Sequence, residues 1–213
     1  IISCLSAVIR SGAKPVFCDV NENSWNMQIS DVERCITDKT KAIIMVHTYG
    51  LPSDAIKLRE LCDKKEIILI EDTAEAHGIN IEGKLAGTFG DISTFSFYAN
   101  KHVTTGEGGI LLTDSEKIND KARKIINLDF GSTKNRFNHN NLYWNYRLSG
   151  LQAALGISQL KNLKHTIKTK IKQGEKYQEL LSDYKKELQL PLRELNNEKN
   201  HYWVFGVVLR KAE

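Results

Sequence analysis

The sequence predicts an α/β fold in which a mostly parallel sheet is covered by helices. Short β-rich runs alternate with amphipathic helical segments from residue 14 to about residue 114. One run, Ile67-Ile68-Leu69-Ile70, is continuously apolar, as expected of a central strand buried on both faces. The chain has 213 residues and 41% hydrophobic content, which is enough to bury a substantial core. These features together favour an open α/β sheet.

The elements follow one another in an order that this fold requires. The chain opens in what reads as the middle of a helix running into a strand. We expect strands at residues 14–20, 42–47, 66–72, 91–97 and 109–113. The clearest intervening helix covers residues 54–64, with Asp54 as its N-cap. One face of that helix carries Leu58, Leu61 and Cys62.

The remainder of the chain turns helical. Residues 149–181 carry apolar side chains at helical intervals, over a length suited to one long helix or two in succession. Residues 202–209 have the pattern of a strand, which indicates entry into a second, smaller α/β domain. Because both ends of the sequence interrupt such elements, we expect a fragment of a longer protein.

Charge and composition argue against several classes of protein. The formal charge is only +4, and the basic excess at residues 161–186 has the spacing of a solvated helix face, so no nucleic-acid partner is expected. We find no membrane-spanning stretch and no secretory signal, and therefore expect a cytoplasmic protein without a membrane partner. The cysteines lack the spacing of a metal site and are expected to be free, buried thiols: Cys4, Cys18, Cys35 and Cys62.

Unusual residues are concentrated at two predicted strand ends. The apolar run 67–70 ends in Glu71-Asp72, and the carboxyl ends of such strands line the ligand crevice of open α/β sheets. The stretch 93–109 contains one lysine, Lys101, followed by a turn with three glycines. Neither a dinucleotide fingerprint nor a phosphate-binding loop ending in lysine is present. Taken alone, Lys101 could be a solvent-exposed loop lysine and Asp72 a helix cap.

The stretch 93–109 resembles the lysine-containing signature of the DegT/DnrJ/StrS family of fold-type I pyridoxal-phosphate sugar aminotransferases. It is especially similar to the perosamine-synthase branch of that family. Four other segments fit the family in the same order and at the same separations: residues 12–19, 47–50, 71–78 and 145–154. The resemblance implies that residues 1–150 are the cofactor-binding large domain without its N-terminal part. Residues 151–213 would be the connecting helix and the start of the small domain.

The resemblance assigns a role to each candidate site residue. It implies that Lys101 forms the Schiff base with pyridoxal 5'-phosphate and then moves protons as general base and acid. Asp72 would pair with the pyridine nitrogen of the cofactor. Ser96 would bind the cofactor phosphate, although it could simply be a strand hydroxyl satisfied by the backbone. Glu75 would lie near the ring hydroxyl, where relatives usually have Gln, and a carboxylate can donate there only when protonated.

Two further positions bear on assembly and charge. Asn145 matches an asparagine that reaches the cofactor phosphate of the neighbouring subunit, which implies a homodimer with shared active sites. The alternative is a turn residue at a helix entry. Arg147 could meet an anionic group or a structural carboxylate. His77 and His102 are not assigned to catalysis, because histidines at such positions more often pack beside a site.

The implied activity is transfer of an amino group from an amino acid, expected to be L-glutamate, to a nucleotide-linked keto-deoxysugar. The product would be an amino sugar for a surface polysaccharide, and a C4 ketone of a 6-deoxyhexose is the first expectation. Dehydratases of this family carry histidine at the Schiff-base position, so Lys101 disfavours that reaction. Two alternatives remain open: a non-catalytic scaffold protein, and an aminotransferase acting on a cyclitol or another small ketone.

Overall fold

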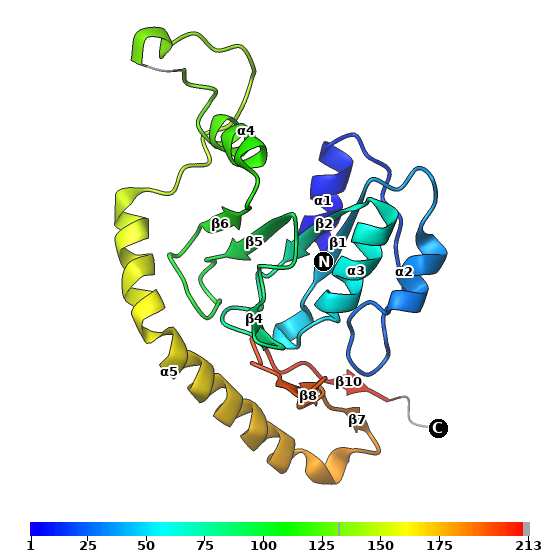
Figure 1. Cartoon of the computed structure of the whole chain (residues 1–213). Coiled ribbons are helices and arrows are strands. Elements are labelled where there is room, and N and C mark those ends of the chain that lie inside the picture. The colour runs from blue at the N-terminus through cyan, green and yellow to red at the C-terminus, as the bar shows by residue number, and fades with distance from the viewer. Residues whose placement is uncertain (132, 211–213) are drawn as a thin grey trace.

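A four-stranded sheet forms the centre of the computed structural model, which describes residues 1–131 and 133–210 (Figure 1). Its strands, in sheet order, are β1 (Ala42–Val46), β2 (Ile68–Asp72), β5 (Ile92–Ser96) and β6 (Gly109–Leu112). β1, β2 and β5 run parallel, and β6 pairs antiparallel with β5. The predicted mostly parallel sheet is confirmed.

Helices surround this sheet. They are α1 (Ile2–Arg10), α2 (Ile29–Cys35), α3 (Ala55–Lys65), α4 (Glu116–Ile126) and α5 (Gly150–Leu180), with short 3-10 turns η1 (Thr48–Gly50), η2 (Thr133–Asn135) and η3 (Ser182–Tyr184). α5 is one continuous helix of 31 residues, which decides between the two predicted possibilities. It begins with a capping box, because the Ser149 side chain accepts from the Gln152 N–H while the Gln152 side chain accepts from the Ser149 N–H. In Figure 1, α5 runs from the β6 side of the sheet to the C-terminal segment.

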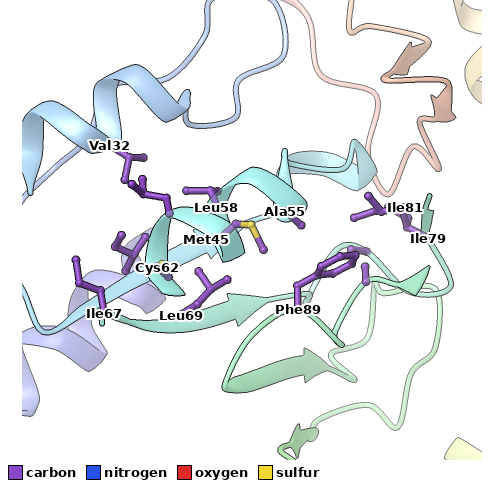
Figure 2. Packing of buried hydrophobic residues seen from close by; sticks show 14 residues of the cluster. Val32, Met45, Ala55, Leu58, Cys62, Ile67, Leu69, Ile79, Ile81 and Phe89 are labelled. Carbon is purple, nitrogen blue, oxygen red and sulfur yellow. The ribbon is translucent and has the colours of Figure 1, made fainter. Parts of the chain in front are cut away.

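The core lies between the sheet and the helices α2 and α3. Figure 2 shows Met45 of β1 and Leu69 of β2 facing Leu58 and Cys62 of α3. Met45, Leu58, Leu69 and Cys62 are all fully buried, and each large apolar side chain so buried contributes about 1.5–3 kcal/mol. The predicted apolar face of α3 is therefore confirmed. Asp54 occupies the N-cap position, but its carboxylate accepts from the Lys57 ammonium instead of the helix backbone.

The expectation that β2 is buried on both faces was wrong. Burial alternates along the strand, so that Leu69 is fully buried and Ile68 is 48% exposed. The period of two is that of a strand with one face on the core. An uninterrupted apolar run cannot reveal this difference, because both faces carry the same kind of side chain.

Two predicted strands differ in the structure. Residues 14–20 form only an isolated bridge between Val20 and Met27, and Phe17 is 75% exposed, so this segment pairs with no strand among the described residues. Within residues 202–209, only β10 (Val208–Leu209) is a strand, and it pairs with β7 (Leu188–Gln189). The backbone of Tyr202 has a φ of 47°, which interrupts an extended chain.

Short hairpins complete the described fold: β3 (Asn80–Ile81) with β4 (Lys84–Leu85), and β8 (Glu194–Leu195) with β9 (Glu198–Lys199). Most of the lysines in residues 161–186 are exposed, as predicted. All four cysteines are free, but only Cys62 is buried, which corrects the expectation that each would be. Among residues 1–131 and 133–210, no helix is long and apolar enough to cross a membrane, and no group of side chains could hold a metal ion.

Candidate active site

The predicted site residues of β2 and β5 lie at one edge of the sheet. Asp72 is the last residue of β2, and Ser96 is the last residue of β5. Because these two strands are parallel neighbours, their carboxyl ends meet, and the turns that follow them carry Glu75 and Lys101. The fold thus brings four of the five predicted site residues to the edge where open α/β sheets bind ligands.

Lys101 lies in a largely dry position in contact with a carboxylate and an aromatic ring. Its Nζ is 3.6 Å from Glu75 Oε1 and 3.5 Å from the centroid of the Trp203 ring, and its side chain is only 9% exposed. Burial lowers the pKa of the Lys101 ammonium, while the nearby carboxylates of Glu75 and Asp72 act in the opposite direction. A lysine with a lowered pKa more readily supplies the neutral amine that attacks a carbonyl.

Glu75 links the Lys101 loop to the chain after β1. Its Oε2 accepts a hydrogen bond of 2.7 Å from the backbone N–H of Tyr49, whose φ is 58°. Burial raises the pKa of the Glu75 carboxyl, and the Tyr49 N–H and Lys101 partly oppose that rise. Both carboxylate oxygens therefore have a partner within the chain.

Asp72 and Ser96 retain capacity for a ligand. Asp72 Oδ2 accepts from the Cys4 thiol at 3.1 Å, and Oδ1 accepts from the Ala74 N–H at 3.0 Å, yet each carboxylate oxygen has a further lone pair. The Ser96 hydroxyl oxygen accepts from the Tyr98 N–H at 3.2 Å, and its own proton remains free to be donated. An amine, a half-buried carboxylate and a hydroxyl donor are the groups that the aldehyde, pyridine nitrogen and phosphate of pyridoxal phosphate require. The donor set fits that cofactor.

Asn145 is the predicted site residue that the fold leaves apart from this group. It forms an isolated bridge with Asn127, and its side chain is exposed and accepts from the Arg147 guanidinium at 2.8 Å. The segment between α4 and α5 that carries it extends away from the sheet in Figure 1. Asn145 is therefore not a turn residue at the helix entry, and Arg147 bonds a neutral amide within its own chain.

Several residues around Lys101 carry no signal in the sequence. Trp203 follows Lys101 by about a hundred residues in the chain, and no spacing rule joins the two. The sequence predicts Cys4 only as a free thiol. The histidines His77, His102 and His201 lie next to one another, with neighbouring ring centroids 6.0 and 6.4 Å apart and ring planes inclined at 59° and 79°. Burial lowers the pKa of His77 and of His102 to about 4, so both imidazoles are neutral at pH 7.

A hollow of about 640 Å³ lies elsewhere, at the amino ends of β1 and β2. Lys41, Lys65 and Ile68 are among its lining residues. It lies at the opposite end of the strands from Asp72, and within the described residues no hydrogen bond or ion pair joins its lysine and threonine side chains to its carboxylates. The chemistry of the side chains therefore places the candidate site at the carboxyl ends of the strands.

Comparison with known proteins shows the family to which this chain is related. The sequence pattern of the DegT/DnrJ/EryC1/StrS aminotransferase family matches residues 2–213. The chain belongs to this family. GDP-perosamine synthase of Vibrio cholerae is 38% identical over 208 residues, which are 98% of this chain and 56% of that enzyme. GDP-perosamine synthase of Escherichia coli O157:H7 is 36% identical over 215 residues, with coverage of 100% and 57%.

Solved structures of this family have the same fold. The aminotransferase TlmJ from Streptoalloteichus hindustanus matches with a TM-score of 0.89 and 28% identity, over 99% of this chain and 57% of that one. Helicobacter pylori PseC matches with a TM-score of 0.90 and 26% identity, over 99% and 56%. The chain thus spans somewhat more than half the length of the relatives it matches. The cofactor of the family is pyridoxal 5'-phosphate, so the predicted family, fold and cofactor are confirmed.

Proposed function

We propose that the protein to which this chain belongs is a pyridoxal-phosphate-dependent aminotransferase acting on a nucleotide-linked keto-deoxysugar. The amino group would come from L-glutamate, and the product would be an amino sugar for a surface polysaccharide. The observation that carries the proposal is the buried Lys101 amine beside Glu75 and Asp72 at the carboxyl ends of β2 and β5. The relatives named GDP-perosamine synthase support a GDP-linked sugar as the first substrate to test.

Each side chain has a defined task in this proposal. When bound, pyridoxal phosphate supplies an aldehyde that links to amines and a ring that withdraws electrons from the reacting carbon. Lys101 supplies the amine that anchors the cofactor, and it then carries a proton away from the substrate carbon and returns one to the cofactor carbon. Asp72 keeps the pyridine nitrogen protonated. Ser96 donates its hydroxyl proton to the phosphate.

Glu75 serves the lysine in this proposal more than the cofactor. Its Oε1 faces the Lys101 ammonium, and its Oε2 is held by the Tyr49 N–H. A Gln side chain at this position has a single acceptor oxygen, so it could not serve both partners in this geometry, and it could not neutralise the ammonium. The carboxylate therefore favours the protonated lysine whenever the amine is not linked to the cofactor.

The proposal includes a homodimer in which Asn145 of one subunit completes the phosphate site of the other. The segment before α5 and the first turn of α5 expose large apolar side chains, which supports an interface there. These are Leu142 (97% exposed), Trp144 (52%), Tyr146 (63%) and Leu151 (85%). We further propose that residues 1–150 belong to the cofactor-binding domain and residues 151–213 to the connecting helix and small domain, and that the protein works in the cytoplasm.

The direct test is an amino-transfer assay on the full-length protein. Glutamate would be offered with a GDP-linked 4-keto-6-deoxyhexose, the same sugar linked to dTDP, the free keto-sugar, and a cyclitol ketone. We expect the nucleotide-linked sugars to gain the amine, detected by mass spectrometry, with the parallel-line kinetics of a ping-pong mechanism. Preference for the cyclitol would identify the alternative substrate. Cofactor uptake without transfer to any ketone from any amino acid would contradict the proposal.

A further inference from the structure

The indole of Trp203 lies against the Lys101 amine. Nζ lies 3.5 Å from the ring centroid and 3.6 Å from Glu75 Oε1, so the amine contacts both a π face and a carboxylate. A tryptophan ring attracts a cation most strongly among the aromatic side chains, and the attraction grows when water is excluded. The Lys101 side chain is 9% exposed, which meets that condition.

Trp203 is itself held in place by three parts of the chain. Its indole Nε1–H donates to the carbonyl of Asn100 at 3.0 Å, next to Lys101 in sequence. Its backbone N–H donates to the carbonyl of Tyr49 at 3.0 Å, and its own carbonyl accepts from Lys170 of α5 at 3.3 Å. The ring therefore has a defined orientation over the amine.

Close packing around this segment leaves little freedom for another arrangement. A Cβ added to Gly50 would lie 2.9 Å from the backbone nitrogen of Trp203, and one added to Gly174 of α5 would lie 2.3 Å from the Tyr202 ring. Gly206 lies against the rings of Tyr49 and Trp25 in the same way. Residues 202–206 are thus fitted between η1 and α5 with Trp203 pointing to the lysine.

We propose that Trp203 is a positioning residue for Lys101, whose indole holds the free ammonium against Glu75 so that the amine stays beside the cofactor site when it is not linked to it. The inference rests on the proposed function, because it gives the free state of the lysine a role in each turnover. It also connects the segment after α5 to the chemistry at the end of β5. Trp203 contacts the lysine and acts through it, and no contact with substrate is part of the proposal.

The test measures the affinity of Lys101 for its proton in the full-length protein with cofactor removed. Tryptophan at position 203 is replaced by analogues with increasing ring fluorination, which weaken the π attraction and leave the shape of the ring almost unchanged. The rate of Lys101 acylation by acetic anhydride, followed by mass spectrometry against pH, gives its pKa in each protein. The charged and titratable neighbours stay the same throughout: Glu75, Asp72, His77 and His102.

We expect the pKa of Lys101 to fall steadily with fluorination, raising the fraction of free amine at a fixed pH by about three- to tenfold over the series. Trp203→Leu, which keeps an apolar cover without a π face, should shift the pKa in the same direction. The matched control is the same fluorination at Trp25, which packs edge-on against Tyr49 and does not contact Lys101. It should leave the pKa unchanged.

A Lys101 pKa that does not respond to fluorination at position 203 would overturn the inference, as would an equal response at position 25. This outcome is separate from failure of the proposed function. If the protein loads cofactor and transfers amine but shows no fluorination response, the proposed function stands and the positioning role of Trp203 is wrong. If the protein never loads cofactor but shows the fluorination response, the contact between Trp203 and Lys101 is supported and the proposed function is wrong.

Discussion

Glu71 and Asp72 are adjacent in β2, yet their carboxylates have entirely separate partners. Asp72 is half-buried and accepts from the thiol of Cys4 in α1. Glu71 is fully buried and accepts hydrogen bonds from His47, Gly87, Phe89, Gly90 and Ser93. Because strand side chains alternate between faces, the Glu71 carboxylate forms hydrogen bonds inside the protein while the Asp72 carboxylate points to the candidate site.

Replacing the buried carboxylate should destabilise the protein without changing the chemistry of the site. Burial alone would raise the pKa of Glu71, but hydrogen bonds from His47 and from backbone N–H groups lower it below its ordinary value. Glu71→Gln should cost about 3 kcal/mol, because it leaves buried donors without a charged acceptor. Urea unfolding at pH 7 measures this, with Glu60→Gln on the exposed side of α3 as control, expected within about 0.5 kcal/mol of wild type.

The stability that Glu71 contributes depends on pH in a defined direction. A carboxyl with a lowered folded pKa contributes stability that is complete above its unfolded pKa and is lost as pH falls through the folded pKa. The difference between wild type and Glu71→Gln should therefore shrink below about pH 4. A difference that stays constant into acid would show that the charge of Glu71 is not what stabilises the fold.

His77 should make the protein sensitive to mild acid. Burial, together with the smaller effects of the neighbouring His102 and Lys101, lowers its pKa to about 4. Its unfolded form binds a proton near pH 6.5, so stability is complete above that pH and falls as the pH drops toward 4. The loss should approach about 3 kcal/mol for this one histidine.

Urea unfolding of His77→Leu at several pH values tests that expectation. The variant should lose less stability than wild type between pH 6.5 and 4.5, because it has no buried imidazole to protonate. His165→Leu is the control, since His165 is exposed on α5. Parallel pH profiles for wild type and His77→Leu would contradict the assignment of a neutral buried imidazole.

The order of elements and most of the sheet could be predicted from local patterns, because strands and helices with one face on the core leave a period in the sequence. Ile68 and Phe17 mark where this reasoning fails. An uninterrupted apolar run does not show which side chains meet the core, and an extended segment becomes a strand only when another strand pairs with it. Both depend on tertiary contacts that a local pattern does not contain.

The site residues that lie in sequence motifs could be predicted. Lys101, Asp72, Glu75 and Ser96 stand in recognisable segments, and the structure brings these segments to one edge of the sheet. Cys4 and Trp203 carry no such signal, because the first contacts Asp72 across 68 residues of chain and the second contacts Lys101 through a fold in the C-terminal segment. The roles of all five predicted site residues at the cofactor stay predictions: Lys101, Asp72, Glu75, Ser96 and Asn145.

Substitutions at two glycines distinguish the cost of backbone strain from the cost of close packing. Gly50 and Gly83 both have left-handed backbones, with φ of 92° and 87°. An added Cβ would meet the backbone of Trp203 at Gly50 but nothing within 4 Å at Gly83. Gly83→Ala should cost about 1 kcal/mol from strain alone, whereas Gly50→Ala should cost about 3 kcal/mol because the Trp203 segment must also move.

Thermal and urea unfolding of both variants measure these costs. Gly50→Ala should also speed acylation of Lys101 in the cofactor-free protein, because displacement of Trp203 uncovers the amine. Gly83→Ala provides the control for backbone strain and should leave the acylation rate unchanged. Equal stability losses and equal acylation rates would mean that the approach of Gly50 to Trp203 does not hold the segment in place.

In the proposed function, Lys101 is the lysine that binds pyridoxal phosphate and moves the proton. Its most direct test is the absorbance spectrum of the full-length protein with pyridoxal phosphate, before and after glutamate, compared with Lys101→Ala and Lys101→Arg. We expect a visible band in wild type that glutamate converts to the shorter-wavelength pyridoxamine form. Both variants should lack the lysine-linked band and carry out the conversion at least about 10²-fold more slowly. A wild-type protein that shows no such band, or a Lys101→Ala protein that keeps both the band and the conversion rate, would contradict the account.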